Sequence, residues 1–122
     1  MATEGSAVPN VELIYAFEKK LVKMSDVLSG AKIKPAKVKV IAFVNTACSS
    51  CMNEMRLLMD LQGKHGDKIA LIAIVTDSNA ERIADALGQE VKSAFTFLAD
   101  PYFSAPALFG FKSTPSSAIV VG

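Results

Sequence analysis

The fold is decided by residues 38–61, which read VKVIAFVNTACSSCMNEMRLLMDL. The first part, 38–44, is mostly apolar and predicts a central strand that is covered on both faces. A short turn carrying Cys48 and Cys51 follows. Apolar residues at helical spacing then predict a helix from about 49 to 62 that stops at Gly63. This order of strand, turn and helix places two thiols at a helix N-terminus.

The spacing of Cys48 and Cys51 predicts a thiol–disulfide active site. Unpartnered backbone N–H groups and the helix dipole stabilise a thiolate there, and Cys-x-x-Cys thiols have pKa values of about 3.5 to 7.5. We expect Cys48, at the exposed cap, to attack substrate and Cys51, one turn inside, to resolve the mixed disulfide. The alternatives are two inert thiols, or a zinc half-site. Zinc needs about four ligands, and the chain offers two cysteines and one histidine, so we expect no metal.

Other side chains near the motif have two interpretations each. Glu54 lies on the same helix face as the second thiol. It either accepts the proton of that thiol or is an exposed first-turn acid that interacts favourably with the helix dipole. Met52, Met55 and Met59 form a stripe at helical spacing, which fills a core more often than it binds Cu(I). His65 stands in a Gly-rich turn and is expected to be a solvated loop residue.

The bulk composition predicts one globular domain. The chain has 122 residues, half of them apolar, and a net charge of +1, which gives no indication of a nucleic-acid partner. Residues 1–10 are expected to form a flexible segment and residues 11–122 the domain. The sequence contains neither an apolar run of membrane-spanning length nor a signal-peptide pattern at its start.

Local patterns predict the other elements. Strands are expected at 11–17 and 20–24 (an N-terminal hairpin), 69–75, 94–98 and 116–121, helical segments at 25–30, 78–87 and 102–109, and a solvated connector at 32–39. This order predicts an α/β domain with a mixed, mainly parallel sheet flanked by helices. Because the last strand ends in the middle of such a sheet, we expect a fragment that lacks a final strand and helix.

Three segments resemble the thioredoxin fold. Residues 43–55, FVNTACSSCMNEM, resemble its active-site segment, with the TlpA/ResA-like branch nearest, and residues 108–115, LFGFKSTP, resemble the segment that carries its cis-proline. Residues 9–10 and 20–26 resemble the N-terminal hairpin extension of that branch. The resemblance, which extends over about residues 9–122, implies a thioredoxin-like fold without its C-terminal strand and helix.

The resemblance also implies a substrate site. It gives Pro115 a cis peptide bond packed against the disulfide, and it gives the Thr114 backbone the role of pairing with an extended substrate. Glu54 matches the acid of the family active site. Two positions depart from the family pattern, since Ala47 replaces the usual aromatic residue and Arg56 replaces a helix-kinking proline.

The function implied by this resemblance is that of a thiol–disulfide oxidoreductase with no cofactor beyond the Cys48–Cys51 disulfide. It would reduce or exchange disulfides in a cysteine-containing protein such as an apocytochrome c. An upstream thiol reductant would return it to the dithiol form. We expect a monomer that works outside the bacterial cytoplasm, in the periplasm or anchored on the outer face of a membrane. One alternative is a peroxiredoxin-type thiol peroxidase, whose usual threonine and proline are replaced here by Asn45 and Ile41. The other is a non-enzymatic copper-handling or scaffold protein.

Overall fold

The computed structural model describes residues 10–30, 36–45, 48–76, 85, 88–100 and 116–121. Within these residues, one sheet has the strand order β2-β1-β5-β4-β3-β6. Its strands are β1 (Glu12–Tyr15), β2 (Lys20–Lys23), β3 (Val38–Val44), β4 (Ile69–Val75), β5 (Phe95–Ala99) and β6 (Ser116–Val121). The helices are α1 (Met24–Ser29), α2 (Ser49–His65), α4 (Gln89–Ala94) and the short 3-10 helix η1 (Gly66–Lys68).

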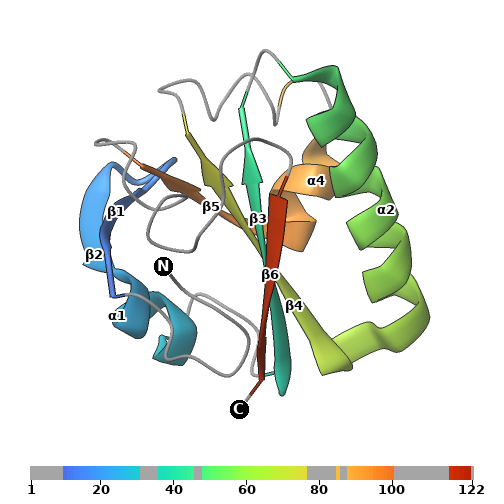
Figure 1. The fold of residues 1–122 in the computed structure, drawn as a ribbon, viewed down its shortest axis with the longest axis horizontal. Helices are drawn as coiled ribbons and strands as arrows, with labels where there is room; N and C mark the ends of the chain where they lie inside the picture. The colour runs from blue at the N-terminus through green and yellow to red at the C-terminus, as the bar shows by residue number, and fades with distance from the viewer. Residues whose placement is uncertain are drawn as a thin grey trace.

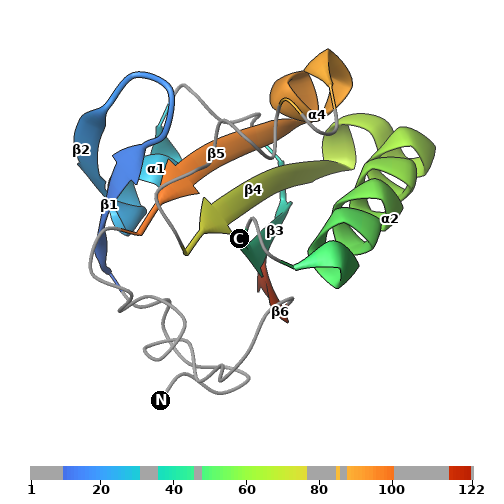
Figure 2. The same cartoon turned by 90° about the horizontal axis from the view of Figure 1, so that it is seen from above.

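The sheet is mixed, as the sequence predicts. Strands β3, β4 and β5 run parallel in its centre, whereas β6 pairs antiparallel with β3, and β1 pairs antiparallel with both β5 and β2. Helices α2 and α4 cover one face and α1 lies against the other (Figures 1 and 2). We call these the α2 face and the α1 face. Because both faces are covered, β4 is buried along its whole length, which explains its continuous apolar sequence.

The core consists of one apolar cluster on each face. Along β3 the side chains alternate: Val40 and Val44 belong to the α2-face cluster, and Ile41 and Phe43 to the α1-face cluster. Helix α2 adds the fully buried Met55 to the first cluster. The predicted boundaries of β3, β4 and β6 are confirmed.

The predicted N-terminal hairpin is confirmed as β1 and β2. Its turn places Lys19 at a φ of 60°, a left-handed conformation that is uncommon outside glycine. The short helical turn predicted at 25–30 is also confirmed as α1, which ends where the Gly30 N–H donates to the Val27 carbonyl at 3.3 Å. At its start, the Ser25 N–H donates to Asn10 Oδ1 at 3.0 Å.

The predicted end of α2 is wrong. The helix continues through Gly63 and ends at His65, so His65 is an exposed residue of the last helical turn and not of a loop. The positive φ that terminates the helix belongs to Gly66, at 57°. A glycine inside a helix costs only about 1 kcal/mol, and the Gln62 side chain compensates locally by donating to the Ile69 carbonyl at 3.1 Å.

Two further predictions need correction. Lys39 is not part of a solvated connector: it is 8% exposed, and its Nζ donates to the Ala36 carbonyl at 2.9 Å. The strand predicted at 94–98 lies one residue later, because the unpredicted helix α4 takes up Gln89–Ala94. That helix follows Gly88, whose φ is 88°, and it buries Val91 against the α2 face.

The helices predicted at 78–87 and 102–109 lie outside the described residues, apart from Asp85, which is helical. In the part of the chain that the structure describes, no helix is long and apolar enough to cross a membrane.

Candidate active site

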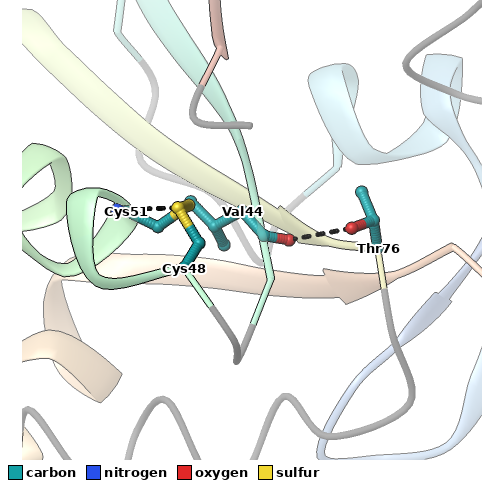
Figure 3. Close-up of a disulfide and its surroundings, with 4 residues drawn as sticks. All are labelled: Val44, Cys48, Cys51 and Thr76. Carbon is teal, nitrogen blue, oxygen red and sulfur yellow. Dashed lines mark hydrogen bonds between the residues drawn. A yellow bond between two sulfur atoms is a disulfide. The ribbon is translucent and has the colours of Figure 1, made fainter. Parts of the chain in front are cut away.

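The two cysteines lie between the end of β3 and the first turn of α2 (Figure 3). Cys48 is the N-cap residue of α2 and is half-buried, whereas Cys51, in the first turn, is fully buried. A disulfide joins them, with their Cα atoms 5.3 Å apart. Cys48 is therefore the more exposed residue of the pair.

The sulfur of Cys48 caps the helix. It accepts a hydrogen bond from the Cys51 backbone N–H at 3.1 Å, in the position that a serine or aspartate oxygen takes in an ordinary N-cap. The same N–H and the positive end of the helix dipole would stabilise a Cys48 thiolate once the disulfide is reduced. The local fold therefore favours the reactive ionisation state at this sulfur.

Thr76 holds the strand that leads to the disulfide. Its backbone N–H and its Oγ1 both donate to the Val44 carbonyl, at 2.9 and 3.3 Å (Figure 3). The next strand is joined in the same way, since the Asp100 N–H donates to the Val75 carbonyl at 3.1 Å. These bonds align the carboxyl ends of the parallel strands, the edge where sites form in such sheets. Sequence reasoning missed Thr76, although it is the first polar residue after a fully apolar strand.

Glu54 lies one turn beyond Cys51 on α2 and is half-buried. The Ser117 hydroxyl of β6 donates to Glu54 Oε1 at 3.4 Å. Ser117 was not among the residues predicted for the site, because no local pattern distinguishes it from the other residues of its strand.

Solved structures of other proteins share the fold of this chain. The thioredoxin domain of a thiol–disulfide oxidoreductase from Bacteroides vulgatus aligns at a TM-score of 0.73, with 18% identity over 99% of this chain and 83% of the other. A Chlorobium tepidum protein described as a thiol:disulfide interchange protein DsbE aligns at 0.68, with 23% identity over 98% of this chain and 78% of the other. An exposed lipoprotein thioredoxin from Streptococcus pneumoniae aligns at 0.64, with 19% identity over 91% and 80%.

The chain has the thioredoxin fold. At these identities the likeness shows the fold alone, and no protein-family model or curated protein sequence matches the chain. The fold resemblance drawn from residues 43–55 and 108–115 is thereby confirmed.

Thr114 and Pro115, the predicted substrate-binding residues of this thioredoxin fold, lie outside the described residues, as does Ala47. The cis peptide bond expected before Pro115 therefore stays a prediction. Strand β6 begins at Ser116, immediately after this segment, and pairs with β3, which leads to Cys48. The pairing of Ser116 with Phe43 places the start of β6 beside the end of β3 that precedes the motif.

The methionine stripe belongs to the core of the thioredoxin fold. Met55 is fully buried in the α2-face cluster, and Met52 and Met59 are partly buried against it. The core-filling interpretation is thus confirmed for all three. Among the residues that the structure describes, no group of three or more His, Cys, Asp or Glu side chains is placed to hold a metal ion.

Proposed function

We propose that this protein is a thiol–disulfide oxidoreductase that uses Cys48 and Cys51 as its redox pair. One observation carries the proposal: a half-buried cysteine at a helix N-cap is bonded to a fully buried one, and its sulfur accepts a backbone hydrogen bond. The first thiol can therefore meet a partner, and the second can be reached only from the first. The thiol–disulfide oxidoreductases among the structural neighbours support the proposal through their shared fold.

The reaction begins from the reduced protein. The Cys48 thiolate attacks one sulfur of a substrate disulfide, which forms a mixed disulfide and releases the other substrate sulfur as a thiolate. Cys51 then attacks the Cys48 sulfur, so that the protein disulfide forms and the second substrate thiolate leaves. The substrate gains two electrons, the protein loses them, and the Cys51 proton passes to the Glu54 carboxylate. We assign Glu54 this role because it lies one helical turn from Cys51 and is half-buried.

The substrate is a cysteine-containing protein. In this proposal Thr114 offers its backbone to an extended stretch of that protein, and Pro115 packs against the redox pair. A thiol reductant restores the dithiol after each cycle, and the protein acts as a monomer. The position of β6, which leads directly from this segment to β3, supports the assignment.

We place the protein in the TlpA/ResA-like branch, acting outside the bacterial cytoplasm on proteins of the cytochrome c maturation type. The N-terminal hairpin of β1 and β2 supports the branch, because it matches the extension that the sequence resemblance implies. The location outside the cytoplasm is supported by two structural neighbours, one described as a DsbE protein and the other as an exposed lipoprotein thioredoxin.

Two described residues argue against the alternative functions. Ile41, where a peroxiredoxin has proline, is a buried central residue of β3 that pairs with β4 and β6, a position where proline would break the ladder. Met55, a thioether of the helical stripe, is buried in the core and not exposed to bind copper.

The test is reduction of insulin by the protein with dithiothreitol as the electron source. We expect the wild-type protein to accelerate precipitation of the insulin chains, and Cys48→Ala to lose that acceleration because the remaining thiol, Cys51, is buried. Asn53→Ala, at an exposed residue of the same helix, is the matched control and should retain full activity. An unaltered rate in Cys48→Ala would refute the proposal.

A further inference from the structure

The polar contact between α2 and β6 assigns a role to a residue that the reaction above does not name. Ser117 opposes Ala42 in the antiparallel pairing of β6 with β3. Its neighbours Ala118 and Val120 pack against the α1-face cluster, so alternation along the strand directs Ser117 to the α2 face. Ala42 belongs to the α2-face cluster and is small, which leaves room beside it for a side chain from α2.

Glu54 is the α2 side chain that meets Ser117. The two residues are 63 positions apart in sequence, and the Ser117 hydroxyl donates to Glu54 Oε1 at 3.4 Å in a partly buried setting. A hydrogen bond from a strand residue restricts the rotamers of the flexible Glu54 side chain. This restriction acts on the group that receives the Cys51 proton in the proposed reaction.

Few other groups compete for this carboxylate. Strand β6 carries no titratable side chain, and the charged side chain of β3, Lys39, is near its start, where its Nζ donates to the Ala36 carbonyl. On α2 the residues one turn before and after Glu54 are Ser50, Cys51, Leu57 and Leu58. Within these described elements, Cys51 is the titratable group that shares the helix face of Glu54.

We propose that Ser117 is a positioning residue that holds the Glu54 carboxylate in one orientation along the α2 face, so that Glu54 takes the proton of Cys51 during resolution. This inference depends on the proposed function. In the step concerned, the bond between Cys48 and the substrate sulfur breaks, the Cys48–Cys51 bond forms, the substrate thiolate leaves, and the Cys51 proton moves to Glu54. Ser117 keeps its own proton throughout and does not touch the reacting sulfurs.

The experiment follows the reaction of the reduced protein with one equivalent of a chromogenic aromatic disulfide. Attack by Cys48 releases the first aromatic thiolate, and attack by Cys51 releases the second, so the second phase measures the resolving step. Ser117→Ala should slow that phase about threefold to tenfold, because a Glu54 carboxylate without its hydroxyl donor no longer keeps one orientation.

Controls separate positioning from folding. The first phase should be unchanged in Ser117→Ala, and Ser117→Thr should restore the second phase because it keeps the hydroxyl. Ser93→Ala, at an exposed serine of α4, should match the wild type in both phases. In a Glu54→Gln background, Ser117→Ala should have no further effect on the rate of the second phase, since the two residues act as one unit.

Each result has one meaning. If the wild-type protein releases no second equivalent, the proposed function itself fails. If it releases both, the assignment of Ser117 is overturned by any of three results: a second phase at the wild-type rate in Ser117→Ala, a threonine variant that behaves like the alanine variant, or an effect of equal size in the Glu54→Gln background.

Discussion

The two ends of α2 satisfy their backbone groups with different chemistry. At the N-terminal end the Cys51 N–H donates to the Cys48 sulfur, whereas at the C-terminal end the Gly66 N–H donates to the Gln62 carbonyl. Gly66 reaches this geometry through a positive φ, and the basic residues Lys64 and His65 fill the last turn. The helix thus ends at a glycine with a positive φ, and the basic residues of its last turn interact favourably with the helix dipole.

The N-terminal end uses a weaker cap. Sulfur is a poor hydrogen-bond acceptor compared with the oxygen of serine or aspartate, so this cap contributes less to folding than the usual residues would. What it provides instead is a sulfur whose negative charge is stabilised by the helix. The comparison teaches that one end of α2 is built for stability, and that the other end gives up some stability for reactivity.

Replacing the sulfur of the N-cap by oxygen should have the largest effect on the difference between the two ends of α2. We expect Cys48→Ser to abolish disulfide exchange, because the attacking thiol is lost and the remaining one, Cys51, is buried. Under reducing conditions, however, it should be about 1 kcal/mol more stable to unfolding than Cys48→Ala, because serine keeps the cap. Urea denaturation of the two variants measures the difference. Equal stabilities would mean that the side chain at this position does not cap the helix.

The C-terminal end should respond in the opposite way. Gly66→Ala forces a Cβ into a positive φ and should cost about 1 kcal/mol of unfolding free energy with little change in exchange activity. Gly63→Ala is the matched control. It lies inside the helix with open space around it, and it should gain about 0.5 to 1 kcal/mol. The prediction fails if both substitutions shift the denaturation midpoint in the same direction.

A smaller effect should come from the strand that leads to the reactive end. Thr76→Val keeps the volume of the side chain and the backbone bond to the Val44 carbonyl, but it removes the longer hydroxyl bond at 3.3 Å. We expect a loss of about 0.5 kcal/mol, because the carbonyl retains one donor. Thermal unfolding of the two oxidised proteins would detect it. A gain in stability would contradict the prediction, because it would mean that the hydrogen bond of the hydroxyl does not offset the cost of burying it.

The sequence predicted those parts of the molecule that depend on local pattern. The apolar runs located β3 and β4, alternation located the N-terminal hairpin, and the cysteine spacing located the disulfide. The end of α2 could not be predicted, because Gly63 and Gly66 are equivalent as sequence signals. The choice between them depends on where the chain must turn to begin β4.

Contacts between distant parts of the chain were beyond sequence reasoning. Thr76 and Val44 are 32 residues apart, and Ser117 and Glu54 are 63 apart. No periodicity encodes either contact, because both depend on the order and register of the strands. Helix α4 was missed for a different reason: its six residues are too few for a helical pattern to be recognised.

The short separation of the two cysteines has a thermodynamic consequence. A crosslink between residues three apart removes much less freedom from the unfolded chain than one that closes a long loop. The difference in unfolding free energy between the oxidised and reduced proteins therefore comes mainly from how strongly the folded state stabilises the disulfide relative to the two thiols. Through the cycle that links folding and oxidation, this difference equals the gap between the reduction potentials of the folded and unfolded chains, with about 30 mV for each 1.4 kcal/mol. A pair of denaturation curves, one for each redox state, would measure how far folding shifts the oxidising power of the pair.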